Sequence, residues 1–132
     1  MSNTEVPDLV EHASFLPFDA TLERLVQAIQ DRGMTIFARI DHAANAREAG
    51  LSMPPSTVLI YGNARGGTPV MLATPAAALD LPLRVLVRER DDGKTVIAFH
   101  PVVAMLRRAG VREDLAARLE PAQQVLLAAV AP

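Results

Sequence analysis

The sequence contains no cysteine, and this single absence removes several classes of chemistry. Disulfide bonds, a cysteine nucleophile and cysteine-ligated zinc or iron–sulfur centres all need a thiol that the chain does not have. Aromatic residues are also scarce, at 4% of the sequence, and tryptophan is missing. Because half of the residues are nevertheless hydrophobic, we expect a core built from Val, Leu, Ile, Ala and Met.

An excess of positive charge and a membrane-spanning apolar run are lacking as well. The 13 Lys and Arg residues stand against 15 Asp and Glu residues, a formal net charge of −2, and this balance argues against a nucleic-acid-binding surface. The uncharged stretch at 66–79 is too short to span a membrane and contains Pro69 and Pro75. The N-terminus has no secretory signal pattern. We therefore expect a cytoplasmic protein with neither a nucleic-acid nor a membrane partner.

Strand and helix patterns alternate along the sequence, and its length is typical of one domain. The order β-α-β-(α)-β-α-β-β-α-α predicts an α+β fold: a single-layer mixed sheet with helices packed mainly on one face. Ile60 is expected to be buried in a central strand, because that strand is apolar on both faces. Strands are predicted at 10–16, 34–41, 57–61, 81–89 and 95–99, and helices at 19–32, 43–49, from 68 onward, 101–109 and 113–130.

The residues after the strand at 57–61 have the pattern of a small binding site. A loop with Gly66 and Gly67 leads into a predicted helix that begins at Thr68, with Pro69 as its first residue. Free backbone N–H groups and the helix dipole at such a start can hold an anion. The pattern is similar to a nucleotide-binding loop but lacks its lysine, so nucleotide hydrolysis is not predicted. The simpler alternative is a tight turn at the glycines and a capping role for Thr68.

A second candidate, His42, directly follows Asp41 at the end of a predicted strand. It can act as a general acid or base, contact a ligand, cap the next helix or seal an interface. If the strands that end at Asp41 and Tyr61 are parallel, their carboxyl ends meet at one edge of the sheet and bring His42 to the glycine loop. An antiparallel pair would place the two at opposite ends. The ligand-binding residues predicted from the parallel arrangement are His42, Asn63, Arg65, Gly67 and Thr68.

Metal-binding and nucleophile motifs are absent from the sequence. Of the three histidines, His12, His42 and His100, none lies four residues from another, so there is no helical metal-binding pair. No serine lies in a G-x-S-x-G motif. No metal or other cofactor is therefore predicted.

Several longer phrases carry a resemblance to a known family. They are FDATLERLVQAIQDRGMTIFARIDHAANAREAGL, PPSTVLIYGNARGGTPVMLATPAAALDLPLRVLVRE and DDGKTVIAF, with IDH, YGN, GTP-x-M and LDLPL in order and at matching distances. Over roughly residues 10–110 the chain resembles the bacterial domain of unknown function 302. The resemblance implies a compact α+β domain that is often a homodimer, and it implies no established reaction. The segment 111–132 matches less well and is expected to be a helical extension of a single domain spanning 1–132.

Three functional hypotheses follow from the sequence. The first is a homodimeric module that binds a small molecule, with a small anion as the expected ligand. The second is an enzyme that uses His42 as a general acid or base. The third is a structural or protein-interaction domain without a ligand. A recessed histidine beside a second polar group would favour the enzyme. A cavity without such a pair would favour the binding module, and a flat apolar patch would favour the interaction domain.

Overall fold

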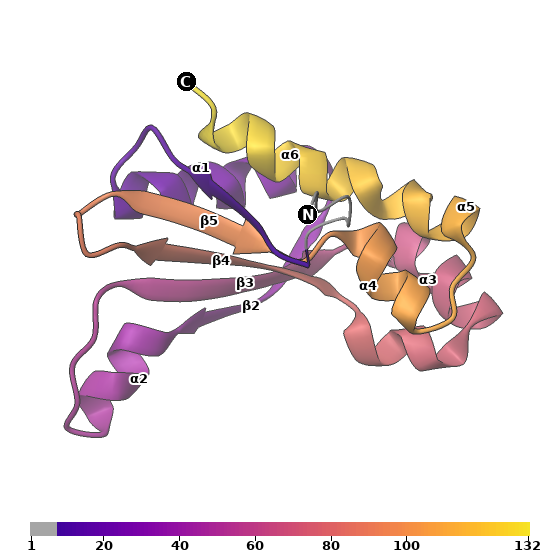
Figure 1. Cartoon of the computed structure of the whole chain (residues 1–132), viewed down its shortest axis with the longest axis horizontal. Helices are drawn as coiled ribbons and strands as arrows, with labels where there is room; N and C mark the ends of the chain where they lie inside the picture. The colour runs from indigo at the N-terminus through magenta and orange to yellow at the C-terminus, as the bar shows by residue number, and fades with distance from the viewer. Residues whose placement is uncertain (1–7) are drawn as a thin grey trace, which may run out of the picture.

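The computed structural model describes residues 8–132 and has the α+β class that the sequence predicts (Figure 1). The helices gather mainly on one face of a five-stranded sheet, as expected. The strands are β1 (Val10–Ala13), β2 (Thr35–Asp41), β3 (Ser56–Gly62), β4 (Leu83–Glu89) and β5 (Thr95–Phe99). The helices are α1 (Phe18–Asp31), α2 (His42–Glu48), α3 (Ala64–Ala73), η1 (Pro75–Asp80), α4 (Val102–Arg108), α5 (Glu113–Ala116), η2 (Ala117–Leu119) and α6 (Glu120–Val130), where η marks a 3-10 helix.

The strand order is β1-β5-β4-β3-β2, and every neighbouring pair is antiparallel. The pairing of β2 with β3 decides the layout of the predicted site. Thr35 lies opposite Gly62 and Asp41 lies opposite Thr57, so the two strands run in opposite directions. The segment through α2 therefore returns the chain along the neighbouring strand instead of crossing over. The sheet that we expected to be mixed contains no parallel pair among the described strands.

One face of the sheet packs against α1, α4 and α6 to form the core. The helical spacing of Leu22, Leu25 and Ile29 places all three on the buried side of α1. They meet alternate residues of the strands, such as Leu59 and Val85, which are fully buried. Burying each such aliphatic side chain contributes about 1.5–3 kcal/mol. The aliphatic core expected from the scarcity of aromatic residues is thus assembled between one sheet face and these helices.

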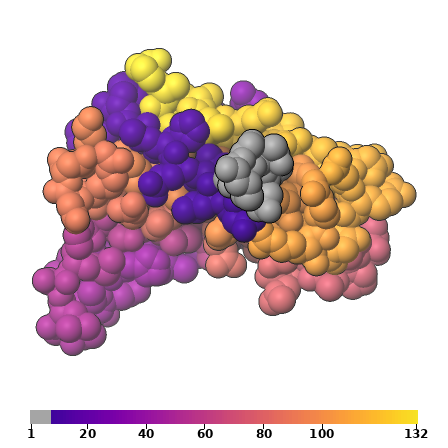
Figure 2. Space-filling model, in the orientation of Figure 1, coloured from indigo at the N-terminus to yellow at the C-terminus, as the bar shows by residue number. Residues whose placement is uncertain are grey.

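Among residues 8–132, no helix lies over the middle of the opposite face of the sheet, which we call the open face. In Figure 1, α2 and η1 lie beyond its two ends, and the outline of the molecule is hollowed between them in the space-filling view (Figure 2). Ile60 lies on this face and is only half-buried, so the prediction that it would be buried there was wrong. The strand is apolar on both sides, but only one of these sides is covered by helices. The apolar residues of the open face that stay partly exposed are Ala38, Ile40, Val58, Ile60 and Leu86.

Candidate functional site

The end of β3 leads directly into α3, and this junction forms the candidate site. Asn63 caps the helix: its side-chain oxygen accepts a hydrogen bond from the Arg65 N–H at 2.8 Å. The backbone N–H groups of Gly66 and Gly67 donate to the Asn63 carbonyl at 3.0 and 2.9 Å. The helix therefore begins at Ala64, and the prediction of a start at Thr68 was wrong. The N–H groups that were expected to hold an anion are already used inside the helix.

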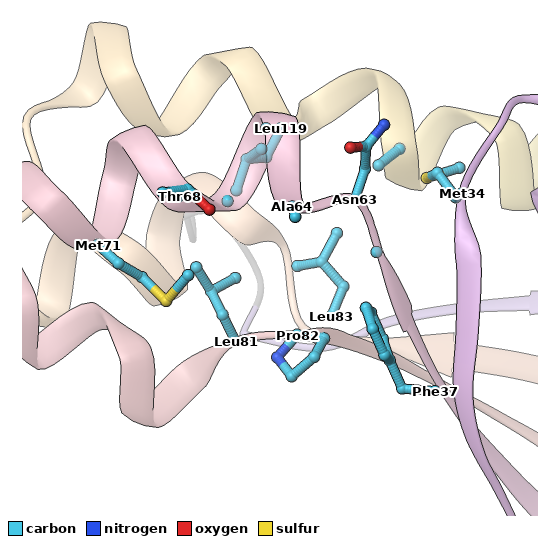
Figure 3. A pocket seen from close by; sticks show the side chains of 14 residues that line it. Met34, Phe37, Asn63, Ala64, Thr68, Met71, Leu81, Pro82, Leu83 and Leu119 are labelled. Atoms are coloured by element: carbon cyan, nitrogen blue, oxygen red, sulfur yellow. The ribbon is translucent and has the colours of Figure 1, made fainter.

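A cavity of about 210 Å³ lies between α3, the start of β4 and the point where η2 continues into α6 (Figure 3). Its walls are almost entirely apolar, and none of the lining residues is charged. Asn63 and Thr68 supply the polar side chains. The lining residues are Met34, Phe37, Gly62, Asn63, Ala64, Gly66, Gly67, Thr68, Met71, Leu81, Pro82, Leu83, Leu119 and Ala122.

The rim of the cavity reaches the open face of the sheet. The register of β2 against β3 shifts between Ile36 and Ala38, and Phe37 lies at this irregularity, 54% exposed. A Cβ atom on Gly62 would lie 3.6 Å from Pro82 Cβ and 3.9 Å from Phe37 Cε2. These are ordinary van der Waals distances, so Phe37 and Pro82 both lie beside Gly62. Because side chains alternate along a strand, Gly62 belongs to the same face as Ile60.

Gly67 leaves part of the cavity empty because it has no side chain. A Cβ atom at this position would meet Met71 Cε at 3.8 Å and Leu81 Cδ1 at 3.9 Å, both of which belong to lining residues. Glycine inside a helix normally destabilises it by about 1 kcal/mol relative to alanine. The sequence pattern suggested a loop here, but the glycine instead provides space beside a helix.

The structure separates the predicted site residues into two groups. Asn63, Gly67 and Thr68 line the cavity, whereas Arg65 is exposed and does not line it. His42 begins α2 beside the Thr57 end of β3. Since a seven-residue strand rises about 3.3 Å per residue, roughly 20 Å of sheet lies between the two groups. Within one chain the structure therefore does not bring His42 to the cavity, because the parallel pairing of β2 and β3 that this required is absent.

The other histidines lie outside the cavity as well. His12 is exposed on β1, and Nδ1 of His100 hydrogen-bonds the Asp8 carbonyl at 2.6 Å. Within residues 8–132, no three side chains of the kinds that bind metals come together.

Sequence inspection missed most of the cavity wall. Phe37, Met71, Pro82 and Leu119 come from four separate segments, and apolar residues carry no motif that marks them as neighbours. The one usable signal was the pair of helical glycines, which we assigned to a loop.

Perturbed titratable groups do not line the cavity either. Burial raises the pKa of Tyr61 above its usual value, and its hydroxyl donates a hydrogen bond to the Ala122 carbonyl at 3.0 Å behind the cavity wall. The hydrogen bond from Arg90 lowers the pKa of the exposed Asp92 in the hairpin between β4 and β5. Neither group indicates acid–base catalysis at the site.

The family assignment rests on a match that covers nearly all of the described residues. Residues 10–131 match the model of the family described as Domain of unknown function DUF302. The chain belongs to this family. The match confirms the resemblance seen in the sequence and extends through α6, beyond residue 110, where the resemblance was expected to end. A crystal structure of an uncharacterized conserved DUF302 protein from Bacillus stearothermophilus has the same fold, with a TM-score of 0.86 at 17% identity. That alignment covers 96% of this chain and all of the other.

Curated relatives of this DUF302 protein carry the name of a channel. It is 37% identical over 98 residues to proteins named Fluoride-specific ion channel FluC 1 from Brucella suis and from Brucella abortus. The aligned segment is 73% of this chain but only 39% and 36% of those proteins, so the chain spans well under half of their length. Within residues 8–132, no helix has the length and apolar character needed to cross a bilayer.

Proposed function

We propose that this protein is a homodimeric binding module for a small, uncharged and mainly apolar molecule. The cavity beside α3 is the observation that carries the proposal. An apolar protein cavity of about 150 Å³ is large enough to bind benzene. In proportion, the 210 Å³ here has room for about eight non-hydrogen atoms.

The chemistry of the wall supports an uncharged ligand over the anion that the sequence suggested. A charged group that enters an apolar site loses its hydration and needs an ionic or hydrogen-bonding partner in return. No lining side chain carries a charge, and the N–H groups of Gly66 and Gly67 are paired within α3. Met34 and Met71 are flexible enough to adjust the wall around ligands of different shape.

Toluene and benzoate form a matched pair of probes, because they share a ring and differ in charge. We expect toluene to shift the NMR signals of residues around the cavity and benzoate to bind at least about tenfold more weakly. Gly67→Val should fill the cavity and weaken toluene binding, whereas Ala73→Val adds a similar side chain to the same helix outside the cavity and should not. Equal affinity for the two probes, or unchanged toluene binding by Gly67→Val, would contradict the proposal.

The open face supports the homodimeric part of the proposal. Contiguous apolar surface of this kind on a protein usually marks an interaction site. Light scattering should give twice the chain mass of 14.2 kDa at micromolar concentration. A concentration-independent mass of one chain would remove this part of the proposal without affecting the ligand site. The cytoplasm stays the proposed location on the sequence argument alone.

The cavity lends no support to the enzyme alternative. His42 is exposed, and the neighbouring Asp41 carboxylate is engaged in capping α2, where it accepts a hydrogen bond from Ala44 N–H at 2.9 Å. A general acid or base must lie within reach of a bound substrate. His42 is at the far end of β3 from the cavity.

A second candidate function comes from the names of the relatives. A domain like this one forms part of proteins named as fluoride-specific channels, so we also propose that it acts together with a fluoride channel. A FluC channel in proteoliposomes should release fluoride at a different rate when this protein is added, and the two should co-purify. Unchanged release together with no co-purification would dismiss this candidate.

A further inference from the structure

We infer that the chain has a second ligand site, a polar pocket that binds a small zwitterion of the amino-acid class. Arg84 binds the carboxylate of this ligand and Asp80 binds its ammonium group. The site does not depend on the apolar cavity beside α3, and each of the two can be tested without the other.

The polar pocket lies where the start of β4 and the end of β5 meet η1 and α4 (Figure 1). Its volume is about 300 Å³, and among the described residues it shares only Leu83 with the apolar cavity. Unlike that cavity, it is lined by charged side chains, which are Asp8, Asp80, Arg84 and Arg108. It can therefore receive a charged group that the apolar cavity excludes.

Hydrogen bonds hold the wall of the polar pocket around His100. The buried Gln123 side chain donates to the His100 carbonyl at 2.7 Å and accepts from the Val102 N–H at 2.8 Å. Nδ1 of His100 lies 2.6 Å from the Asp8 carbonyl, and because a carbonyl can only accept, Nδ1 is the donor. The pocket is thus formed before a ligand arrives, as is usual for small-molecule sites.

The pairing of the four charges indicates what the ligand must carry. Arg108 and Asp8 form an ion pair with each other. Within the described part of the chain, Arg84 and Asp80 form no ion pair, either with each other or with another residue. One positive and one negative side chain therefore line the same pocket without a protein partner. A ligand with one charge of each sign satisfies both.

A free amino acid has the required groups on one small molecule. The guanidinium of Arg84 can donate two parallel hydrogen bonds to its carboxylate, and the Asp80 carboxylate can accept from its ammonium group. Ala104 and Met105 supply apolar wall for its side chain. A simple anion fits less well, because it would meet the negative charge of Asp80.

The volume of the polar pocket sets the size of this ligand. An apolar protein cavity of about 150 Å³ is large enough to bind benzene. In proportion, the 300 Å³ of the polar pocket has room for about twelve non-hydrogen atoms, the number in phenylalanine. L-Phenylalanine is therefore the probe.

The first experiment compares three ligands on the full unmodified chain by NMR titration. L-Phenylalanine should shift the amide signals of Arg84 and Met105. 3-Phenylpropanoate lacks the ammonium group and 2-phenylethylamine lacks the carboxylate. Because each leaves one charge of the pocket without a partner, each should bind at least about tenfold more weakly than L-phenylalanine.

The second experiment assigns each charge of the ligand to its side chain. Arg84→Gln should weaken L-phenylalanine binding at least about tenfold but leave 2-phenylethylamine binding unchanged, and Asp80→Asn should do the same with 3-phenylpropanoate unchanged. Arg47→Gln and Glu48→Gln remove the same charges from exposed positions of α2, at the other end of the sheet, and should change nothing. All four variants should keep the parental melting temperature.

Three outcomes would overturn the inference. The first is no saturable binding of L-phenylalanine up to about 10 mM. The second is equal affinity for L-phenylalanine and 3-phenylpropanoate, which would make the pocket an anion site. The third is an equal loss of binding in the pocket and the α2 variants, which would place the ligand elsewhere. Toluene binding is a separate measurement, so failure of the apolar cavity leaves this site standing, and the reverse also holds.

Discussion

Tyr61 shows how one side chain connects the sheet to the last helix. It is the single tyrosine of the chain and is completely buried on the core side of β3. Its hydroxyl donates a hydrogen bond to the Ala122 carbonyl of α6, so the polar end of this large buried side chain has a hydrogen-bond acceptor. Burial without a nearby cation disfavours the phenolate and raises the pKa.

This raised pKa makes stability depend on pH in the alkaline range. The unfolded chain loses the tyrosine proton near pH 10 while the folded chain keeps it, so the stabilising contribution is complete below pH 10 and declines above it. The free energy of unfolding should fall by up to about 1.4 kcal/mol per pH unit above pH 10. Because Tyr61 is the only tyrosine, tyrosinate absorbance should rise only as the fold is lost.

Tyr61→Phe is the control for this prediction. It should lack the alkaline slope due to Tyr61 and be about 1 kcal/mol less stable at neutral pH, where it loses one hydrogen bond. Tyrosinate absorbance that appears near pH 10 while circular dichroism stays native would show that the side chain is accessible.

At the scale of elements, β3 separates the two faces of the sheet residue by residue. Leu59 points into the core and is fully buried, while its neighbour Ile60 points to the open face and is partly exposed. The two side chains have similar size and lie on the same strand. Replacing each of them with alanine therefore compares how much burial on the core face and on the open face contributes to the free energy of unfolding.

We expect Leu59→Ala to lower the free energy of unfolding by about 2–5 kcal/mol, as for other large-to-small changes in a core. Ile60→Ala should cost less, about 1–2 kcal/mol, because part of the Ile60 side chain stays exposed in the single chain. Urea denaturation at low protein concentration measures both values. Equal losses would mean that the open face is covered within one chain.

The first turn of α3 is stabilised by a local contact, the cap that Asn63 provides. Asn63→Ala removes the side chain that caps the helix and should destabilise the protein by about 1 kcal/mol. Asn63→Asp keeps a capping oxygen and should retain most of the stability. Equal melting temperatures for Asn63→Asp and Asn63→Ala in thermal denaturation would contradict this role of the cap.

For the whole molecule, the C-terminal helices are part of the core. Leu126 and Val130 of α6 are 0% and 3% exposed, and α6 packs along α1. The buried Gln123 side chain accepts from Val102 N–H at 2.8 Å and donates to the His100 carbonyl at 2.7 Å, which ties α6 to the end of β5 and the start of α4. Together with the family match through residue 131, these contacts show that the segment expected to be an extension completes the fold.

A chain that ends at Val111 should therefore fail to fold, because Leu25, Ile29 and Tyr61 would lose their cover. The measurement is the dispersion of amide signals in an NMR spectrum. Removal of the exposed Ala131 and Pro132 alone should leave the spectrum native. A dispersed spectrum for the short chain would show that α6 is dispensable.

The sequence by itself determined the parts that depend on neighbouring residues. The helical spacing of Leu22, Leu25 and Ile29 defined α1, and Gly33 ended it with a positive φ of 75°. Asp92-Gly93 marked the turn between β4 and β5. These signals are local: periodicity reports which side of an element is apolar, and turn residues report backbone preference. They were sufficient for the α+β class.

Only the tertiary structure decided the direction of strand pairing and the place of the cavity. Pairing direction depends on hydrogen bonds between β2 and β3, which the apolar pattern of either strand does not record. It moved His42 to the far end of the sheet. The sequence offered Thr68 as the helix cap, whereas in the structure Asn63 caps α3. Gly66 then lies inside the helix, where a Cβ atom would be 3.2 Å from Leu119. The cavity exists because distant segments leave space between them, and empty space has no sequence signature.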